Sequence, residues 1–201
     1  MRKSKVMNDR SKTVLVVSRM FLAAVWISSL ASIPNFRAYQ DQMSSGVAIK
    51  DIVAPYASVS VFVTITSIGA WAYTSVWLRQ AVDKANLNVP GTVRLSRGWA
   101  MWGWIVPIVS LWFPRMIVND LLKSTAVADT ESEINVNTWW MTWIMYSLLN
   151  SASAVYAFTD MYSSKSPINP IHPEMEIAGA CLLTASYFVW TKIVTKLANT
   201  Y

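Results

Sequence analysis

Few side chains in this 201-residue sequence could do chemistry. His172 is the single histidine, in a Pro-Ile-His-Pro context, and Cys181 is the single cysteine. An internal disulfide is therefore impossible, and a thiolate metal site or a cysteine–histidine dyad is not expected; we interpret Cys181 as a small buried hydrophobic residue. Asp120 and Asp160 stand at the ends of apolar segments, where solvation explains them. No phosphate-binding glycine loop, dinucleotide fingerprint or His-Glu metal motif occurs, so we predict no catalytic residue, no metal and no cofactor.

Two polar side chains could instead bind a ligand. Arg115 follows Pro114 directly, and its guanidinium suits a lipid phosphate or an anionic solute. We favour the alternative that Arg115 is a positively charged anchor at the cytoplasmic surface. Asn150 lies in the middle of an apolar run; we interpret it as a helix-packing residue, with a ligand contact as the alternative. Small and polar residues predict helix-contact faces in two segments: Ser60, Thr64, Ser67 and Thr74 in one, and Ser147, Asn150, Ser151 and Ala154 in the other.

The elements that hold these residues are predicted to be membrane helices. Hydrophobic residues make up 54% of the chain and charged residues only 14%, well below the quarter or so that is usual in soluble domains. The net charge is +6, but the basic residues gather at the ends of apolar runs, which indicates anionic lipid headgroups rather than nucleic acid. The eleven tryptophans also favour a membrane interface. The lipid bilayer is thus the expected partner.

We predict an all-α integral membrane protein, with a basic cytoplasmic tail at 1–12 and one helical membrane domain at 13–197. Four apolar stretches are long enough to cross about 30 Å of hydrocarbon: residues 13–33, 52–78, 138–158 and 176–197. The first reads as an uncleaved signal anchor, because its apolar core is longer than that of a cleaved signal peptide. Residues 34–51 and 163–173 are predicted as external loops, and Pro90-Gly91 as a turn after the second helix.

The stretch from Trp99 to Val118 holds four tryptophans and two prolines, and its placement decides the topology. We predict a re-entrant or interfacial segment rather than a fifth span. If it does not cross, the lysines and arginines outside are Arg37, Lys50 and Lys165; if it spans, the outside instead holds Arg37, Lys50, Arg115, Lys123, Lys192 and Lys196. The first count fits the positive-inside rule better and places the N-terminus in the cytoplasm. It also gathers one tryptophan belt at the cytoplasmic interface, formed by Trp77, Trp99, Trp102, Trp104, Trp139, Trp140 and Trp143.

The pattern around this segment resembles a bacterial, largely actinobacterial, membrane family known as domain of unknown function 4328. The matching residues, between about 61 and 149, are Val76-Trp77, Arg79, Ser96, Gly98-Trp99-Ala100, Trp104, Pro107, Leu111-Trp112, Pro114, Asp120-Leu121 and Trp139-Trp140. Family members often carry asparagine where this chain has Ser110. The resemblance implies a multi-pass protein of the bacterial inner membrane and marks Trp99, Trp104, Pro107, Leu111, Trp112 and Pro114 as a shared structural motif. It implies no activity.

Three hypotheses for function follow. The first is a non-catalytic accessory, scaffold or partner-binding protein, which could pair with another membrane protein or with itself. The second is a small-solute or lipid transporter with the Trp/Pro segment as its gate; it predicts a cavity at membrane depth, reached by Arg115, Ser110 or Asn150. The third, a lipid-modifying membrane enzyme, is the least favoured, because the sequence offers few polar groups that could converge in a pocket.

Overall fold

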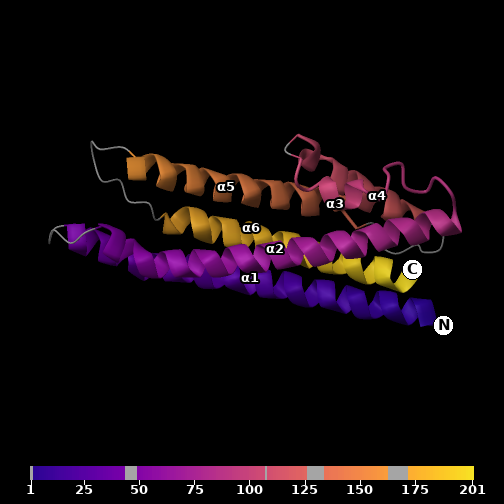
Figure 1. Cartoon of the computed structure of the whole chain (residues 1–201), viewed down its shortest axis with the longest axis horizontal. Helices are drawn as coiled ribbons and strands as arrows, with labels where there is room; N and C mark the ends of the chain where they lie inside the picture. The colour runs from indigo at the N-terminus through magenta and orange to yellow at the C-terminus, as the bar shows by residue number, and fades with distance from the viewer. Residues whose placement is uncertain (1, 44–48, 107, 126–133, 163–171) are drawn as a thin grey trace. The chain divides into compact units, whose positions relative to one another are not determined.

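The computed structural model describes residues 2–43, 49–106, 108–125, 134–162 and 172–201 of the chain, and every regular element within these ranges is helical (Figure 1). The predicted all-α fold is confirmed. The elements are α1 (Arg2–Met43), α2 (Ile49–Asn88), α3 (Trp99–Trp102), the 3-10 helix η1 (Val109–Leu111), α4 (Phe113–Thr125), α5 (Val136–Tyr162) and α6 (Pro173–Thr200).

The four predicted spans all lie inside the long helices α1, α2, α5 and α6. Within the described residues, three stretches are both long and apolar enough to cross a membrane: Asp9–Ala38, Ser58–Asn88 and Pro173–Thr200. The chain therefore has the helices of a membrane protein, built from the runs that the sequence marks as apolar.

α1 is longer than the predicted span. It begins at Arg2, within the predicted basic tail, and continues to Met43, so the prediction of a loop from residue 34 was wrong. Pro34 lies inside α1 and cannot donate a backbone hydrogen bond. Such a proline is tolerated in a membrane helix because side chains and neighbouring helices satisfy the freed groups. Next to Pro34, the Asn35 side-chain amide donates to the carbonyl of Ala31 at 2.7 Å.

The turn after α2 forms where it was predicted. α2 ends at Asn88, and Gly91 has φ +80°, a left-handed conformation that favours glycine. The Val93 backbone N–H then donates to Asn86 Oδ1 at 3.1 Å and holds the turn against the end of α2. Most of the predicted external segment 163–173, namely residues 163–171, lies outside the described residues. Pro173 is the first residue of α6, a position where a backbone N–H would have no helical partner.

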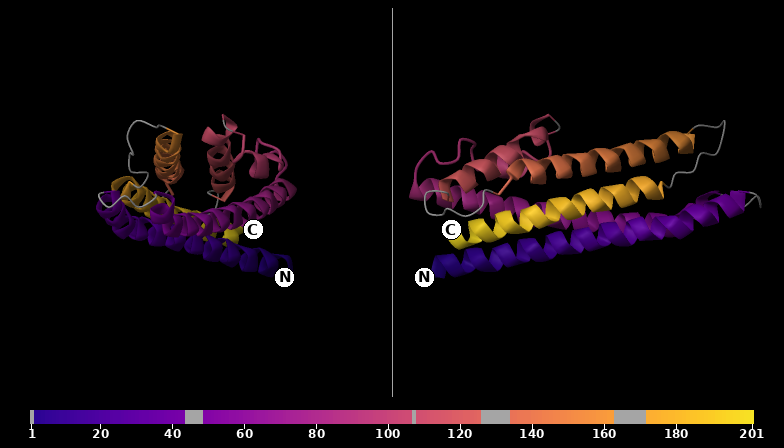
Figure 2. Two further views of the ribbon diagram at one scale, coloured as in Figure 1. Left: turned by 60° about the vertical axis from the view of Figure 1, so that its left-hand side comes forward. Right: turned by 180° about the vertical axis from the view of Figure 1, so that it is seen from behind.

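The contacts divide the chain into two compact units. Unit 1 comprises residues 1–19, 68–141 and 186–201, and unit 2 comprises residues 20–67 and 142–185. Within unit 1, the first turns of α1 and the last turns of α6 lie at the same end (Figure 2). Lys84 Nζ donates to the Tyr201 carbonyl at 2.8 Å and links α2 to the end of α6. The core of unit 1 contains Val14, Trp77, Leu78, Ile117, Leu121, Ile193 and Leu197, each 1% exposed or less.

In unit 2, α1 buries a row of small side chains next to Phe21 and Val25 and exposes other large apolar ones. Ala24, Ser28 and Ser32 recur every four residues on α1 and are buried, whereas Ile27 and Leu30 are more than half exposed. Small buried residues let membrane helices approach closely, and large apolar side chains can face lipid. Cys181 belongs to the outer set: it is exposed on α6, so its interpretation as a buried residue was wrong. Hydrophobicity alone does not distinguish a lipid-facing position from a buried one.

Candidate functional site

The stretch predicted as one segment, 99–118, is broken into short pieces in unit 1. α3 has four residues, η1 has three, and α4 then runs past the predicted end to Thr125. The turn after α3 requires glycine at position 103. A Cβ there would lie 2.5 Å from the Trp99 carbonyl oxygen and 3.2 Å from Phe113 Cβ, so a larger residue would clash. This glycine was missed by the sequence reasoning, which weighed only the tryptophans and prolines. Pro107 lies outside the described residues.

Two indoles satisfy carbonyl groups that the broken helix leaves without a helical partner. Trp104 Nε1 donates to the Ala100 carbonyl at 3.1 Å, and Trp140 Nε1 donates to the Leu111 carbonyl at 2.7 Å. An unpaired backbone group away from water costs several kcal/mol in an apolar setting. By donating hydrogen bonds to these carbonyl groups, the two indoles lower the cost of irregular backbone in an apolar environment.

Five tryptophans of unit 1 form one continuous cluster. Trp139 stacks on Trp190 with ring centroids 5.2 Å apart, and Trp190 contacts Trp77 edge-on at 5.9 Å. On the other side, Trp104 lies 6.4 Å from Trp139 and 6.0 Å from Trp140. The cluster joins α2, the Trp/Pro segment, α5 and α6. Trp190 was missed because it stands alone in the apolar run of α6.

The remaining tryptophans of the predicted belt lie elsewhere. Trp99 contacts Phe113 at 4.9 Å, Trp102 is 55% exposed, and Trp143 belongs to unit 2, where it lies 5.8 Å from Tyr146. Of the other motif residues, Pro114 is buried, whereas Leu111 and Trp112 are exposed. The motif thus has a face that packs and a face that is exposed.

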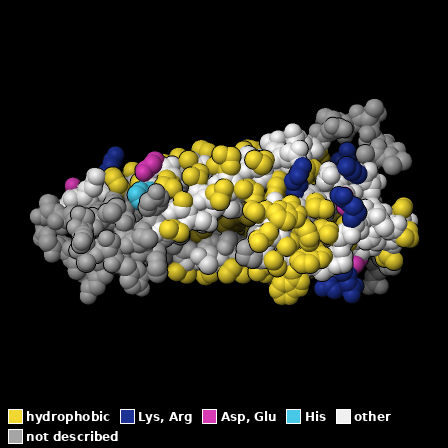
Figure 3. All heavy atoms as spheres, turned by 90° about the horizontal axis from the view of Figure 1, so that it is seen from above, with side chains coloured by type: hydrophobic (Ala, Val, Ile, Leu, Met, Phe, Trp, Pro, Cys, Tyr) yellow, Lys and Arg dark blue, Asp and Glu magenta, His cyan; other side chains and the backbone are white. Residues whose placement is uncertain are grey.

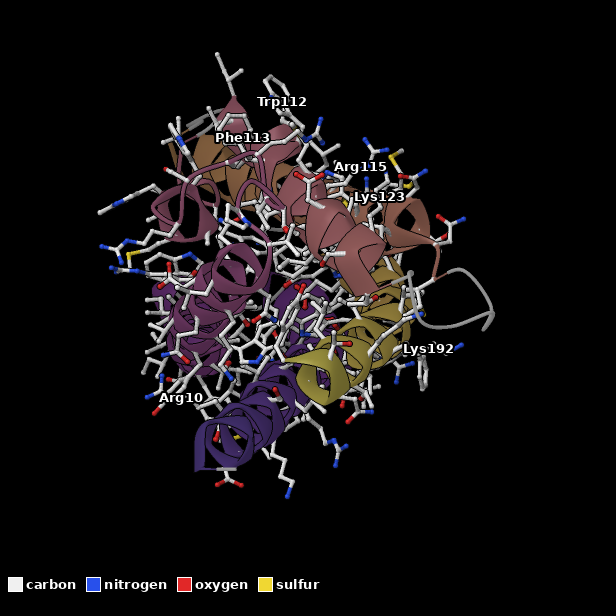
Figure 4. The ribbon with its side chains drawn as sticks, turned by 90° about the vertical axis from the view of Figure 1, so that its right-hand side faces the viewer. Arg10, Trp112, Phe113, Arg115, Lys123 and Lys192 are labelled. Carbon is white, nitrogen blue, oxygen red and sulfur yellow. The ribbon has the colours of Figure 1, made fainter. Side chains whose placement is uncertain are left out.

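Arg115 and Asp120 have partners that the sequence did not indicate. Arg115 is exposed, and its Nε donates to Asn137 Oδ1 at 2.8 Å (Figure 4). Asp120 is only 7% exposed and accepts from Arg94 through both carboxylate oxygens, with Nη2–Oδ1 at 2.9 Å and Nε–Oδ2 at 3.1 Å. Solvation was therefore the wrong explanation for Asp120. Its hydrogen bonds raise the pKa of Arg94, and the ion pair fixes the segment before α3 onto α4.

Unit 2 contains a cavity of about 540 Å³ whose lining mixes polar and apolar side chains. Residues of α1, α2, α5 and α6 line it, with Phe21, Trp143 and Tyr146 among the aromatic ones. Its polar lining residues are Ser28, Ser29, Ser60, Thr64, Ser67, Ser147, Asn150, Ser151, Ser153 and Glu176. Asn150 is therefore at the cavity, as the transporter hypothesis predicts, whereas Arg115 and Ser110 belong to unit 1 and are not among the lining residues.

The two faces predicted to pack helices together supply much of this lining. Three hydroxyls donate to carbonyls of their own helices: Thr64 to Ser60 at 2.9 Å, Ser67 to Thr64 at 2.8 Å and Ser147 to Trp143 at 2.9 Å. A hydroxyl whose proton is engaged in this way can still accept a hydrogen bond. The cavity is thus rich in acceptors. Thr74 is buried in unit 1, and the side chain of Ala154 lies outside the description.

The described residues contain no group of three or more histidine, cysteine, aspartate or glutamate side chains that could hold a metal ion. His172 lies 3.6 Å from Glu174 at the start of α6.

Within the described residues, three helices are long and apolar enough to cross a membrane, which is typical of an α-helical membrane protein. The family model "Domain of unknown function (DUF4328)" matches residues 40–194, and the chain belongs to this family. The resemblance seen in the sequence is thereby confirmed, over a longer range than its motifs cover. Comparison with curated proteins and with solved structures found no match.

Proposed function

We propose that this protein is a non-catalytic multi-pass membrane protein that binds a small polar solute in the cavity of unit 2. The main support is the cavity itself, which is about 540 Å³ in volume and is lined by ten serine, threonine, asparagine and glutamate side chains along apolar helices. A scaffold has no need of such a lining, whereas polar groups within membrane helices are costly and mark binding sites or pathways. We therefore place solute binding ahead of the accessory role.

The topology that we propose places the chain in the cell membrane with a cytoplasmic N-terminus. It has four spans, formed by α1, α2, α5 and α6. Unit 1 contains the first turns of α1, the Trp/Pro segment and the last turns of α6. The described part of the segment has no spanning helix. Its longest piece, α4, has 13 residues, or about 20 Å at 1.5 Å per residue, against about 30 Å of hydrocarbon.

Charge supports the same topology. Among the described side chains, unit 1 carries Arg10, Lys12, Arg19, Arg79, Lys84, Arg94, Arg97, Arg115, Lys123, Lys192 and Lys196, whereas unit 2 carries Arg37. This distribution is what the positive-inside rule predicts if unit 1 lies toward the cytoplasm.

The lining also indicates the class of solute. The described lining residues include one carboxylate, Glu176, and no lysine, arginine or histidine. Together with the acceptor-rich hydroxyls, this favours a solute that donates hydrogen bonds, either neutral or cationic, and disfavours an anion. Asn150 is the one amide in the lining and can both donate and accept.

A size-matched series of sugars tests this proposal. Glucosamine, glucose and gluconate are titrated against the full chain in nanodiscs, with thermal stability and calorimetry as readouts. We expect glucosamine and glucose to stabilise the protein and gluconate not to. In the Asn150→Leu variant the affinity should fall by about tenfold, since a lost hydrogen bond is worth about 1–1.5 kcal/mol.

The matched control is Leu148→Ala, because Leu148 is exposed on the same helix and is not a lining residue. Its affinity should match that of the parent chain. A preference for gluconate, or an equal loss in both variants, would overturn the assigned solute class. If none of the sugars binds and a membrane protein is retained through purification, the partner-binding role is favoured instead.

A further inference from the structure

We infer that the exposed face of the Trp/Pro segment, together with the basic residues of α4, is a binding surface for anionic phospholipid headgroups of the surrounding bilayer. This inference rests on the proposed membrane location and not on the cavity. We call the exposed apolar residues of this face the lipid-contact surface; they are Trp102, Ile105, Val106, Ile108, Leu111 and Trp112.

The lipid-contact surface is held outward by the packing behind it. Ile108 is 68% exposed and Trp112 41%, while Trp140 holds the Leu111 carbonyl on the inner side. The backbone is further fixed by turn hydrogen bonds, including Ser110 N to the Val106 carbonyl at 2.8 Å. Rotation of these side chains alone therefore cannot bury them, because the backbone that carries them is fixed. Apolar and tryptophan side chains arranged in this way suit the boundary between headgroups and acyl chains.

α4 places cations next to this surface. Its inner face is buried through Ile117, Val118 and Leu121, and Arg115 and Lys123 are on its exposed side. Figure 4 shows Trp112 and Arg115 near the start of the helix, with Lys123 further along it. In Figure 3, hydrophobic side chains gather in the part of the visible face that also carries most of its lysine and arginine side chains.

Arg115 is positioned to bind a phosphate. Asn137 accepts from its Nε, which leaves the two Nη groups as a fork that matches phosphate oxygens. The nearby carboxylate of Asp120 is already engaged by Arg94, and residues 99–118 contain neither aspartate nor glutamate. Within residues 99–125 the charged side chains are thus Arg115, Lys123 and Asp120, and Asp120 is paired with Arg94. That complementarity favours an anionic lipid over a protein partner as the occupant.

Spin-label quenching in vesicles tests the inference on the full chain. In a Cys181→Ser background, Ile108→Cys is labelled with the dye NBD, and the protein is reconstituted in phosphatidylcholine with about one third phosphatidylglycerol. Two samples are compared, in which either the phosphatidylcholine or the phosphatidylglycerol carries a nitroxide on its acyl chain. We expect a blue-shifted emission and quenching about twofold stronger from the phosphatidylglycerol, since only this headgroup is anionic.

Changing Arg115→Gln and Lys123→Gln together should remove the preference for phosphatidylglycerol. Arg37→Gln is the matched control, because Arg37 is exposed but belongs to unit 2, and it should leave the preference intact. Water-like emission with no quenching by either lipid would overturn the inference, and would indicate a protein cover if a protein remains bound. Equal quenching by both lipids, or a preference that survives the double change, would also overturn it. Sugar binding measured on the same vesicles reports separately on the cavity.

Discussion

Replacing Trp139 by alanine should lower the free energy of unfolding by about 3–5 kcal/mol, the range for truncating a buried aromatic side chain. Trp139 is 3% exposed and stacks on Trp190 at 5.2 Å with the rings inclined by 20°. It also contacts Trp104 and Trp140, so its removal opens a cavity at the centre of the tryptophan cluster. Aromatic pairs add about 0.5–1.5 kcal/mol beyond the area that they bury. No other single substitution proposed for this chain should destabilise it as much.

The measurement is unfolding of the detergent-solubilised full chain, followed by circular dichroism. Trp102→Ala is the matched control, because Trp102 is 55% exposed in the same unit. It should cost about 1 kcal/mol or less. Similar losses in the two variants would show that the cluster does not hold unit 1 together.

Ala24→Leu should destabilise unit 2 by about 1–3 kcal/mol, because the extra carbons have no room in a packed interior. Ala24 is fully buried, in line with Ser28 and Ser32 along α1. Hydrogen bonds hold α1 close to α6: Trp26 Nε1 donates to Thr184 Oγ1 at 2.9 Å, and Ser29 Oγ to the Glu176 carbonyl at 3.1 Å. A larger side chain on the buried stripe should strain this approach.

The preceding residue provides the control. Ala23 is exposed, so Ala23→Leu adds the same carbons on the outer face and should leave the unfolding transition unchanged. If Ala23→Leu were the more damaging substitution, the assignment of inner and outer faces would be wrong. The same unfolding measurement serves both variants.

The features that depend on neighbours in sequence were predicted well. Long apolar runs gave the four long helices, because the length and apolarity of a run are local properties. Pro90-Gly91 marked the turn after α2, because only glycine adopts the observed conformation easily. The spacing of tryptophan and proline in 99–118 indicated the family to which the chain belongs.

The features that depend on distant residues were not predictable. Arg94 and Asp120 are 26 residues apart, and no local pattern pairs them. The same holds for the stack of Trp139 on Trp190 and for the cavity, which four separate helices line. Small polar faces were recognised as inward-facing, but sequence does not tell whether such faces touch each other or enclose a space. Cys181 was misplaced because an apolar environment can be lipid as well as protein.

The central claim is that the Trp/Pro segment does not cross the membrane, so that the chain spans it four times. Two single-cysteine variants test this claim: Arg37→Cys and Lys123→Cys, both at exposed positions and both in a Cys181→Ala background. Each is treated with a membrane-impermeant maleimide, on intact cells and on inverted vesicles. We expect Arg37→Cys to react from outside the cell and Lys123→Cys from the cytoplasmic side only. Labelling of both cysteines from outside would contradict the four-span topology and make 99–118 a fifth span.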